Sequence, residues 1–166
     1  MREQRFYGKY RGIVTDNQDP FKIGRVKAHV LDVLGDNASG WALPCMPFAG
    51  DNTGFYAIPD VGARVWIEFE QGDPDYPIWS GCWWGSEEEL PSEASDAPYD
   101  RVVIKTSQQQ VLILDDSEGG QITLQTSSGQ TIVMSSESIK IDNGQGATIE
   151  LSGPSVSVND DALEVT

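Results

Sequence analysis

The 166-residue chain has few of the residues that most chemical sites require. It contains one histidine, His29, and two cysteines, Cys45 and Cys82. One histidine cannot form a His-rich metal site, and two cysteines are too few for a disulfide scaffold. No apolar run approaches 18 residues, and the polar N-terminus lacks the apolar segment of a secretory signal. We therefore expect no metal, no cofactor and no membrane-spanning helix, and we expect both cysteines to be buried free thiols.

Basic residues are also scarce. Lys and Arg number 11 against 26 Asp and Glu, which gives a formal net charge of −15. Such a chain repels phosphate backbones, so nucleic acid is not expected as a partner. The imbalance is uneven, because residues 1–85 carry eight basic and eleven acidic residues, whereas residues 86–166 carry three and fifteen.

Aromatic residues divide the chain in the same place. All five Trp and all five Phe lie in residues 1–85, and Tyr99 is the single aromatic residue of residues 86–166. Residues 86–100 (SEEELPSEASDAPYD) are acidic, contain two prolines and show no apolar periodicity. We predict three regions: a barrel over 1–85, an acidic linker over 86–100 and a repeat over 101–166.

The first region is typical of a small β-barrel. Apolar and polar residues alternate over five stretches between Gly-, Asp- and Pro-rich turns. The stretches are residues 6–16, 24–34, 39–46, 63–70 and 78–84. In the second stretch Val26 and Ala28 alternate with Arg25, Lys27 and His29. In the fourth, Val65, Ile67 and Phe69 alternate with Arg64, Trp66 and Glu68. Five short antiparallel strands favour an OB-type barrel, because closure removes most exposed sheet edges.

Three features of this region admit a chemical interpretation beside a structural one. Asp73 and Asp75 in GDPDYP could be catalytic carboxylates, but Asp beside Pro in a Gly-started turn is common turn chemistry. His29 lies on the polar side of its strand and is expected at the surface. A tryptophan cluster follows, with members Trp79, Trp83 and Trp84. It could stack on sugars or bases, or pack the barrel or a subunit contact.

The third region is a repeat of two apolar residues separated by one polar residue, with turn formers between the repeats. The central pairs are Leu112/Leu114, Ile122/Leu124, Ile132/Met134, Ile139/Ile141, Ile149/Leu151 and Val156/Val158, flanked by Val102/Ile104 and Leu163/Val165. From Ile122 onward the pairs start 10, 7, 10, 7 and 7 residues apart. One apolar face per short strand predicts a β-solenoid or an intertwined β-helix.

This repeat is too short to be stable as a single-chain solenoid. With three strands per coil it would have fewer than three coils and two open ends, whereas stacked repeats need about three units and capped ends. We therefore expect an obligate homo-oligomer in which neighbouring chains supply the strands above and below each strand. A threefold arrangement suits a narrow apolar interior, although the periodicity alone does not fix the number. The acidic surface would keep such an assembly solvated.

Residues 7–85 resemble the OB-fold domain of the central spike proteins of contractile tails. This family includes phage baseplate assembly protein V and the spike of type VI secretion. The resemblance is carried by YRGIVTDNQDPFKIGRVKAHV (10–30), WALPCMPFAG (41–50) and GFYAIPDVGARVWIEFEQGDPDYPIWSGCWWG (54–85). The motif positions are Gly24, Arg25, Val26, Pro59, Gly62, Val65, Phe69, Gly72, Asp73, Pro74, Pro77 and Gly81. The C-terminal repeat, which ends in VNDDALEVT, is similar to the family's triple-stranded β-helix.

The resemblance implies an all-β protein, with an N-terminal OB-fold barrel followed by a trimeric intertwined β-helix. It implies a structural, non-enzymatic homotrimeric spike that docks on baseplate hub proteins at the tube end and pierces the target envelope. Contact with the target membrane would be transient. Such a spike would assemble in the bacterial cytoplasm into a phage tail or a phage-tail-like particle.

Departures from the family pattern refine this expectation. Only about 15 residues separate the barrel from the repeat, so no lysozyme domain is expected there, and no histidine follows His29 to build an iron-binding tip. The long N-terminal gripping domains of type VI spikes are also missing, which favours a minimal spike. We expect a PAAR-like tip protein to dock on Leu163, Val165 and Thr166, and effectors are a further class of partner.

Two other functions remain open from the residues alone. One is a carbohydrate-binding β-solenoid module, although Tyr99 would be its one aromatic platform. The other is a nucleic-acid-binding OB protein, which would need a basic groove that residues 1–85, with a net charge of −3, do not supply.

Overall fold

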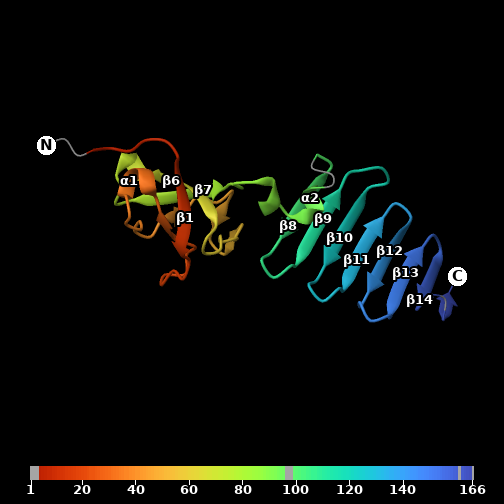
Figure 1. Ribbon diagram of the computed structural model, residues 1–166. Coiled ribbons are helices and arrows are strands. Elements are labelled where there is room, and N and C mark those ends of the chain that lie inside the picture. Colours follow the sequence, from red (N-terminus) through yellow and green to blue (C-terminus); the bar gives the residue numbers. More distant parts are fainter. Residues whose placement is uncertain (1–3, 96–98, 161, 166) are drawn as a thin grey trace. The chain divides into compact units, whose positions relative to one another are not determined.

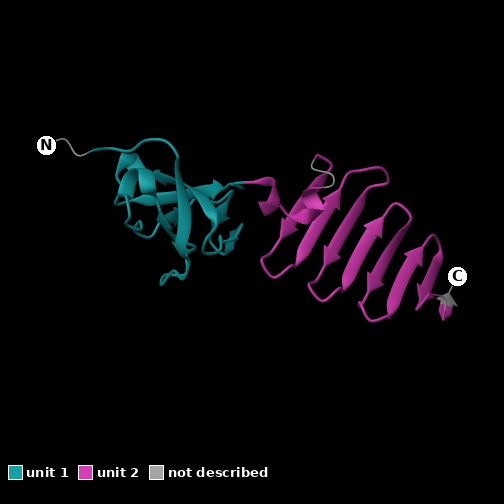
Figure 2. Ribbon diagram, viewed as in Figure 1, with its two compact units in different colours: residues 1–85 teal, residues 86–166 magenta. Residues whose placement is uncertain are grey.

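The computed structural model describes residues 4–95, 99–160 and 162–165, and its strands far outnumber its short helices (Figure 1). The chain divides into two compact units, residues 1–85 and 86–166 (Figure 2). The all-β class expected from the sequence is thus confirmed. Within the described part of the chain, no helix has the length and apolar character needed to cross a membrane.

The first unit is built on a five-stranded sheet with the strand order β2-β1-β6-β7-β3. Its elements are β1 (Tyr10–Asp16), β2 (Lys27–His29), α1 (Leu31–Leu34), β3 (Leu43–Pro44), β4 (Ala49–Gly50), β5 (Thr53–Gly54), β6 (Arg64–Phe69), the 3₁₀ turn η1 (Glu70–Gly72) and β7 (Pro77–Cys82). Strands β4 and β5 form a separate hairpin that the sequence analysis did not predict.

The sheet closes on itself through the segment that precedes β3. Ala42 bridges to Val26, and Ala38 bridges to His29, so this segment lies beside β2. Strand β3 then continues against β7 at the other edge of the sheet, and the two strands are parallel. The expectation that all five strands pair antiparallel is therefore wrong for β3, because the strand that closes the barrel must reach β7 from the β2 side.

The barrel core consists of small and branched apolar side chains around one tryptophan. Its buried members are Val14, Val26, Ala28, Val30, Ala42, Val65, Ile67, Phe69 and Trp79. The alternation predicted for the second and fourth stretches is thereby confirmed. The Trp79 indole N–H donates a 3.0 Å hydrogen bond to the carbonyl oxygen of Gly24, so the one polar group of this ring is satisfied inside the barrel.

Gly24 occupies a position that only glycine fits without strain. Its φ is +83°, and an added Cβ would lie 2.8 Å from Cδ1 of Ile58. Just before it, the carboxylate of Asp19 accepts hydrogen bonds from the Arg25 guanidinium at 2.6 and 3.0 Å and from the backbone N–H groups of Phe21 and Ile23. The Arg25 contact, with these backbone donors, holds the pKa of Asp19 well below its ordinary value. The loop that leads into β2 is therefore held by hydrogen bonds between its own residues.

The second unit is a single antiparallel ladder in which neighbours in the chain are neighbours in the sheet (Figure 1). Its strands are β8 (Arg101–Lys105), β9 (Val111–Asp115), β10 (Gln121–Gln125), β11 (Thr131–Ser135), β12 (Ser138–Asp142), β13 (Thr148–Ser152), β14 (Ser155–Val158) and β15 (Leu163–Val165). Strands β9 to β14 each pair on both sides with strands of the same chain. We expected neighbouring chains to supply these partners, and the observed pairing differs because the two- to five-residue loops join successive strands as hairpins.

Residues 86–95 contain more structure than a bare connector. They form a 3₁₀ turn, η2 (Glu87–Glu89), and one turn of helix, α2 (Ser92–Ser95). Helix α2 contacts β8, and its Glu93 carboxylate lies 2.8 Å from Nζ of Lys105. This segment belongs to the second unit and anchors the first strand of the ladder.

We predict that Gly24→Ala destabilises the barrel by about 1–3 kcal/mol, because alanine at this φ is strained and its Cβ meets Ile58. Thermal unfolding followed by tryptophan fluorescence measures the effect, since every Trp lies in the first unit. Gly40→Ala is the matched control, because nothing lies within 4 Å of an added Cβ there. Equal midpoints for the two variants would contradict this role of Gly24.

Candidate functional site

The register of the ladder brings the apolar pairs of every repeat onto one side of the sheet, here called the apolar face. Val102 pairs with Leu114, Leu114 with Ile122 and Ile122 with Met134. The same row continues through Ile139, Leu151 and Val156. A second row contains Ile104, Leu112, Leu124, Ile132, Ile141, Ile149, Val158 and Leu163. All twelve positions predicted as the core of the repeat therefore lie in two continuous rows.

These rows are open to solvent in the single chain. Twelve large apolar residues of the apolar face are between 37% and 59% exposed. On the opposite face, by contrast, Val111 is 7% exposed and Thr123 is 9% exposed. The side chains predicted as core are thus partly exposed in the single chain. An apolar surface of this size and continuity marks an interaction site.

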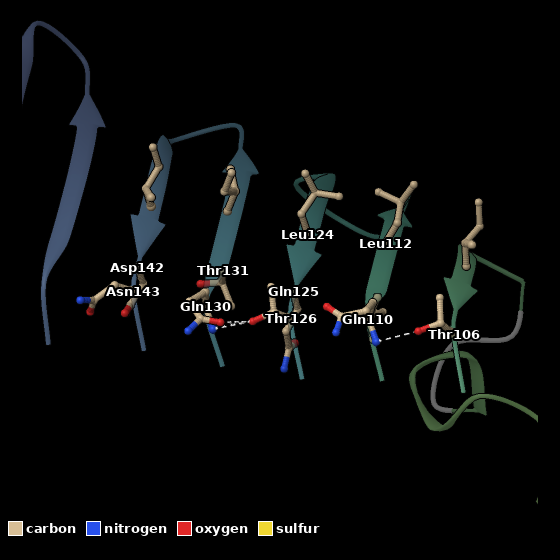
Figure 3. Close-up of a pocket in the computed structure, with 14 residues that line it drawn as sticks. Thr106, Gln110, Leu112, Leu124, Gln125, Thr126, Gln130, Thr131, Asp142 and Asn143 are labelled. Atoms are coloured by element: carbon tan, nitrogen blue, oxygen red, sulfur yellow. Dashed lines mark hydrogen bonds between the residues drawn. The ribbon is translucent and has the colours of Figure 1, made fainter. Parts of the chain in front are cut away.

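The apolar face is hollowed along its second row, beside the turns. An open depression of about 630 Å³ lies over β8 to β12, lined by apolar side chains that include Leu112 and Leu124. Figure 3 shows polar side chains gathered at one end of these strands, where Thr126 bonds Gln130, while the two leucines lie farther along their strands. The face thus has an apolar centre and a polar rim at the turns, which is the anatomy of a protein interface.

Ion pairs hold the opposite face where the ladder begins. Nε of Arg101 lies 2.6 Å from the carboxylate of Asp115, and its NH1 group donates to the carbonyl oxygen of Glu93 at 3.1 Å. Hydrogen bonds from the Ser117 hydroxyl and backbone N–H, together with the Arg101 guanidinium, lower the pKa of Asp115 to about 2. The Lys105 ammonium lowers the pKa of Glu93 in the same way. Helix α2, β8 and β9 are therefore tied together on the side away from the apolar rows.

The motif positions of the barrel have structural roles. Val26, Val65 and Phe69 are core residues, and Pro77 is also buried. Gly24, Gly62, Gly72 and Gly81 all have positive φ. The Pro59 carbonyl oxygen accepts a hydrogen bond from Asn17, Arg25 binds Asp19, and Pro74 lies in the turn before β7. These residues shape the barrel.

The carboxylates near β7 follow turn chemistry. Asp73 accepts a 3.1 Å hydrogen bond from the backbone N–H of Asp75 and lies 2.7 Å from the Arg5 guanidinium. Both contacts lower the pKa of Asp73, the backbone hydrogen bond most strongly. Across the part of the chain that the structure describes, no group of three or more His, Cys, Asp and Glu residues is arranged to hold a metal ion.

The cysteines differ from the expectation. Cys45 and Cys82 are both free, but both are exposed and not buried. Cys82 ends β7, beyond the register shift in the pairing of β7 with β6, and its side chain is exposed there. Partial desolvation nevertheless raises the pKa of the Cys82 thiol.

The residues expected to bind a tip protein lie at the end of the ladder. Strand β15 is an edge strand, and Leu163 is 59% exposed there. Val165 pairs with Val156 through the backbone. The side chain of Val165 and all of Thr166 lie outside the described residues.

We predict that Asp115→Asn destabilises the second unit at pH 7, and that the difference from the unchanged chain shrinks between about pH 4 and pH 2. The folded-state pKa of Asp115 is lowered from 3.8 to about 2, so its contribution is present above the unfolded value and is lost as the folded carboxylate takes up a proton. Circular dichroism melts across this pH range measure it, with Asp116→Asn as the equal-charge control. A difference that stays constant down to pH 2 would contradict the prediction.

Two family models match the chain, one in each compact unit. Residues 10–84 match the type VI secretion system/phage-baseplate injector OB domain, and residues 101–164 match the phage baseplate V C-terminal trimerisation domain. The two matches together span both the barrel and the ladder.

Curated relatives of the chain include proteins that are named spike proteins and one that is named a toxin. The chain is 42% identical over 74 residues to the type VI secretion system spike protein VgrG5 of Pseudomonas aeruginosa, a stretch that covers 42% of this chain and 9% of the relative. It is 38% identical over 74 residues to VgrG1a of the same organism, covering 42% and 12%. It is also 40% identical over 62 residues to the actin cross-linking toxin VgrG1 of Vibrio cholerae, covering 35% and 6%. The matched stretch thus spans about a tenth of the relatives' own length.

The resemblance noted in the sequence is therefore confirmed in both halves of the chain. A closed barrel falls where the OB-domain match lies, and a ladder with one open apolar face falls where the trimerisation-domain match lies. The chain belongs to the family of phage baseplate V and type VI secretion spike proteins.

Proposed function

We propose that three copies of this chain associate through their apolar faces and form the spike at the end of a contractile injection tube. In this assembly the barrel docks on the hub proteins of the baseplate, and the ladder points toward the target envelope and pierces it. The role is structural and not enzymatic. The trimer assembles in the cytoplasm before it joins a phage tail or a phage-tail-like particle.

The observation that carries the proposal is the open apolar face. The backbone groups of its inner strands are paired within the chain, so association over this face must satisfy side chains. Burying the exposed part of its twelve large side chains contributes about 10 kcal/mol per chain, at roughly 2 kcal/mol for each fully buried side chain. That is comparable to the whole stability of a small domain. The match to a trimerisation domain supports three as the number of copies.

The distribution of charge in the second unit supports the same arrangement. Residues 86–166 carry three basic and fifteen acidic residues, and the apolar rows contain none of them. Charge therefore lies on the faces that stay in water, where it keeps separate particles apart. The apolar rows are the surface on which copies can meet without burying a charge.

We predict that the chain has a solution mass near three times 18.1 kDa, about 54 kDa, and that Ile122→Asp reduces it to the monomer value. In a trimer of this variant, three carboxylates would meet in the apolar interior without partners. Light scattering on a gel-filtration column measures the mass. Gln121→Asp is the control, because it places the same residue on the opposite face of the same strand, and its mass should stay near 54 kDa. A folded monomer from the unchanged chain would overturn the proposal.

We predict that a PAAR-like tip protein binds the exposed end of the ladder, and that Leu163→Asp weakens this binding about tenfold or more. Leu163 is the most exposed of the twelve side chains and lies on the edge strand β15. Co-purification and titration with the tip protein measure it, beside the solution mass of each variant. Ser155→Asp on the opposite face of β14 is the control. Equal binding by both variants would exclude docking on Leu163.

A further inference from the structure

The barrel carries a stack of two arginines and two tryptophans on the outside of β1 and β6. Gly12, Val14, Val65 and Ile67 point into the core, so the residues between them point outward. Arg11 lies directly across from Trp66 in the antiparallel pairing of these strands.

Both guanidinium groups lie over the same indole ring. The Cζ atom of Arg11 is 4.7 Å from the Trp83 ring centroid, and that of Arg64 is 5.1 Å from it. Trp66 packs against Trp83 with 5.8 Å between ring centroids. The stack thus joins β1, β6 and the segment after β7 in one cluster, named here the Arg–Trp stack.

The charge of this cluster contrasts with the rest of the chain. The net charge of the protein is −15, yet two positive groups share one ring here. The nearby Lys9 is balanced by Glu68, 3.3 Å away. Arg11 is exposed, and among the described residues no carboxylate pairs with it. Its positive charge is therefore open to a partner.

A guanidinium that lies over an aromatic ring keeps the N–H donors at its edge available. Those donors form a planar fork that matches a carboxylate in a two-pronged contact. Ile13, which pairs with Arg64 across the strands and is 49% exposed, adds an apolar contact beside the fork. Arginine and tryptophan in such a setting are the residues that most often dominate the affinity of an interface.

One buried group in the cluster has no partner. The indole Nε1 of Trp83 is covered, yet it meets no acceptor among the described residues. An unsatisfied buried N–H of this kind lowers the stability of the isolated barrel. The cluster therefore does not maximise the stability of the isolated barrel, which agrees with a role in binding.

We infer that the Arg–Trp stack is the surface by which the barrel grips its hub, and that the hub presents carboxylates to it. This inference rests on the proposed docking function and names the chemistry of that contact. Phosphates would also fit the guanidinium fork, but the barrel as a whole has a net charge of −3, which opposes a long polyanion. A protein surface with a few acidic side chains is the partner that fits.

The experiment compares the intact trimer with Arg11→Glu and Arg11→Gln in titrations against a purified baseplate hub protein. We expect Arg11→Glu to weaken hub binding about tenfold or more, and Arg11→Gln to weaken it less. Lys22→Glu makes the same change of charge in the loop before β2, outside the stack, and should leave the affinity within about twofold. Light scattering verifies that every variant keeps the mass of the unchanged protein.

Two further probes separate failure of the inference from failure of the docking function. An octaglutamate peptide and a 20-nucleotide oligo-dT strand are titrated against the same proteins. If the hub binds all variants alike, the stack is not the docking surface. If the hub does not bind the unchanged trimer, the docking proposal fails. In that case peptide binding tests the Arg–Trp stack. We expect Arg11→Glu to abolish peptide binding, and unchanged peptide binding by this variant would overturn the inference. If the unchanged protein binds oligo-dT but not the peptide, and Arg11→Glu abolishes the oligo-dT binding, the partner is a nucleic acid and not an acidic protein. That result would overturn the inference.

Discussion

The ladder of the second unit satisfies its backbone within one chain and leaves its side chains unsatisfied. Each inner strand pairs on both sides with its neighbours in the sequence, so the main-chain hydrogen bonds need no second molecule. Its apolar face nevertheless stays in water along all eight strands. A sheet with one such face is incomplete until another layer covers it. Association of copies over this face thus depends on side-chain burial and needs no pairing of the inner strands between chains.

This division has a mechanical consequence for a spike. Eight strands at about 4.7 Å spacing extend over roughly 33 Å along the direction in which their hydrogen bonds run. A load along that direction is carried by several backbone hydrogen bonds between each pair of neighbouring strands. Each such pair is also joined covalently by its hairpin loop. Burying the apolar faces against one another then adds a contact that must fail along its whole length at once. Resistance to force of this kind depends on the unfolding rate.

The sequence predicted what depends on local periodicity. Alternation of side chains is a property of any strand, so the pairs at Ile122/Leu124 and Ile149/Leu151 identified the apolar face without knowledge of strand partners. The source of those partners was predicted wrongly, as neighbouring chains, because intrachain and interchain pairing give the same periodicity. Loop length was the missed signal, since Ser136–Glu137 and Gly153–Pro154 are two-residue connections typical of hairpins. The Arg–Trp stack was also missed, because Arg11 and Trp83 meet only after β1 and β7 take their places on either side of β6.

The distribution of charge decides which surfaces of this chain can meet another molecule. The charged side chains of the strands, such as Lys140 and Glu150, lie on the opposite face of the ladder, and close approach of a second copy there would remove them from water, which is disfavoured. The apolar face carries no charge, so it alone allows copies to approach closely at no electrostatic cost. On the barrel, the exposed guanidinium of Arg11 is positive, whereas the net charge of the chain is negative. This guanidinium attracts acidic groups, which the net charge of the chain repels. The proposed self-association and the proposed contact with an acidic partner therefore use different units, and neither competes with the other for the same surface.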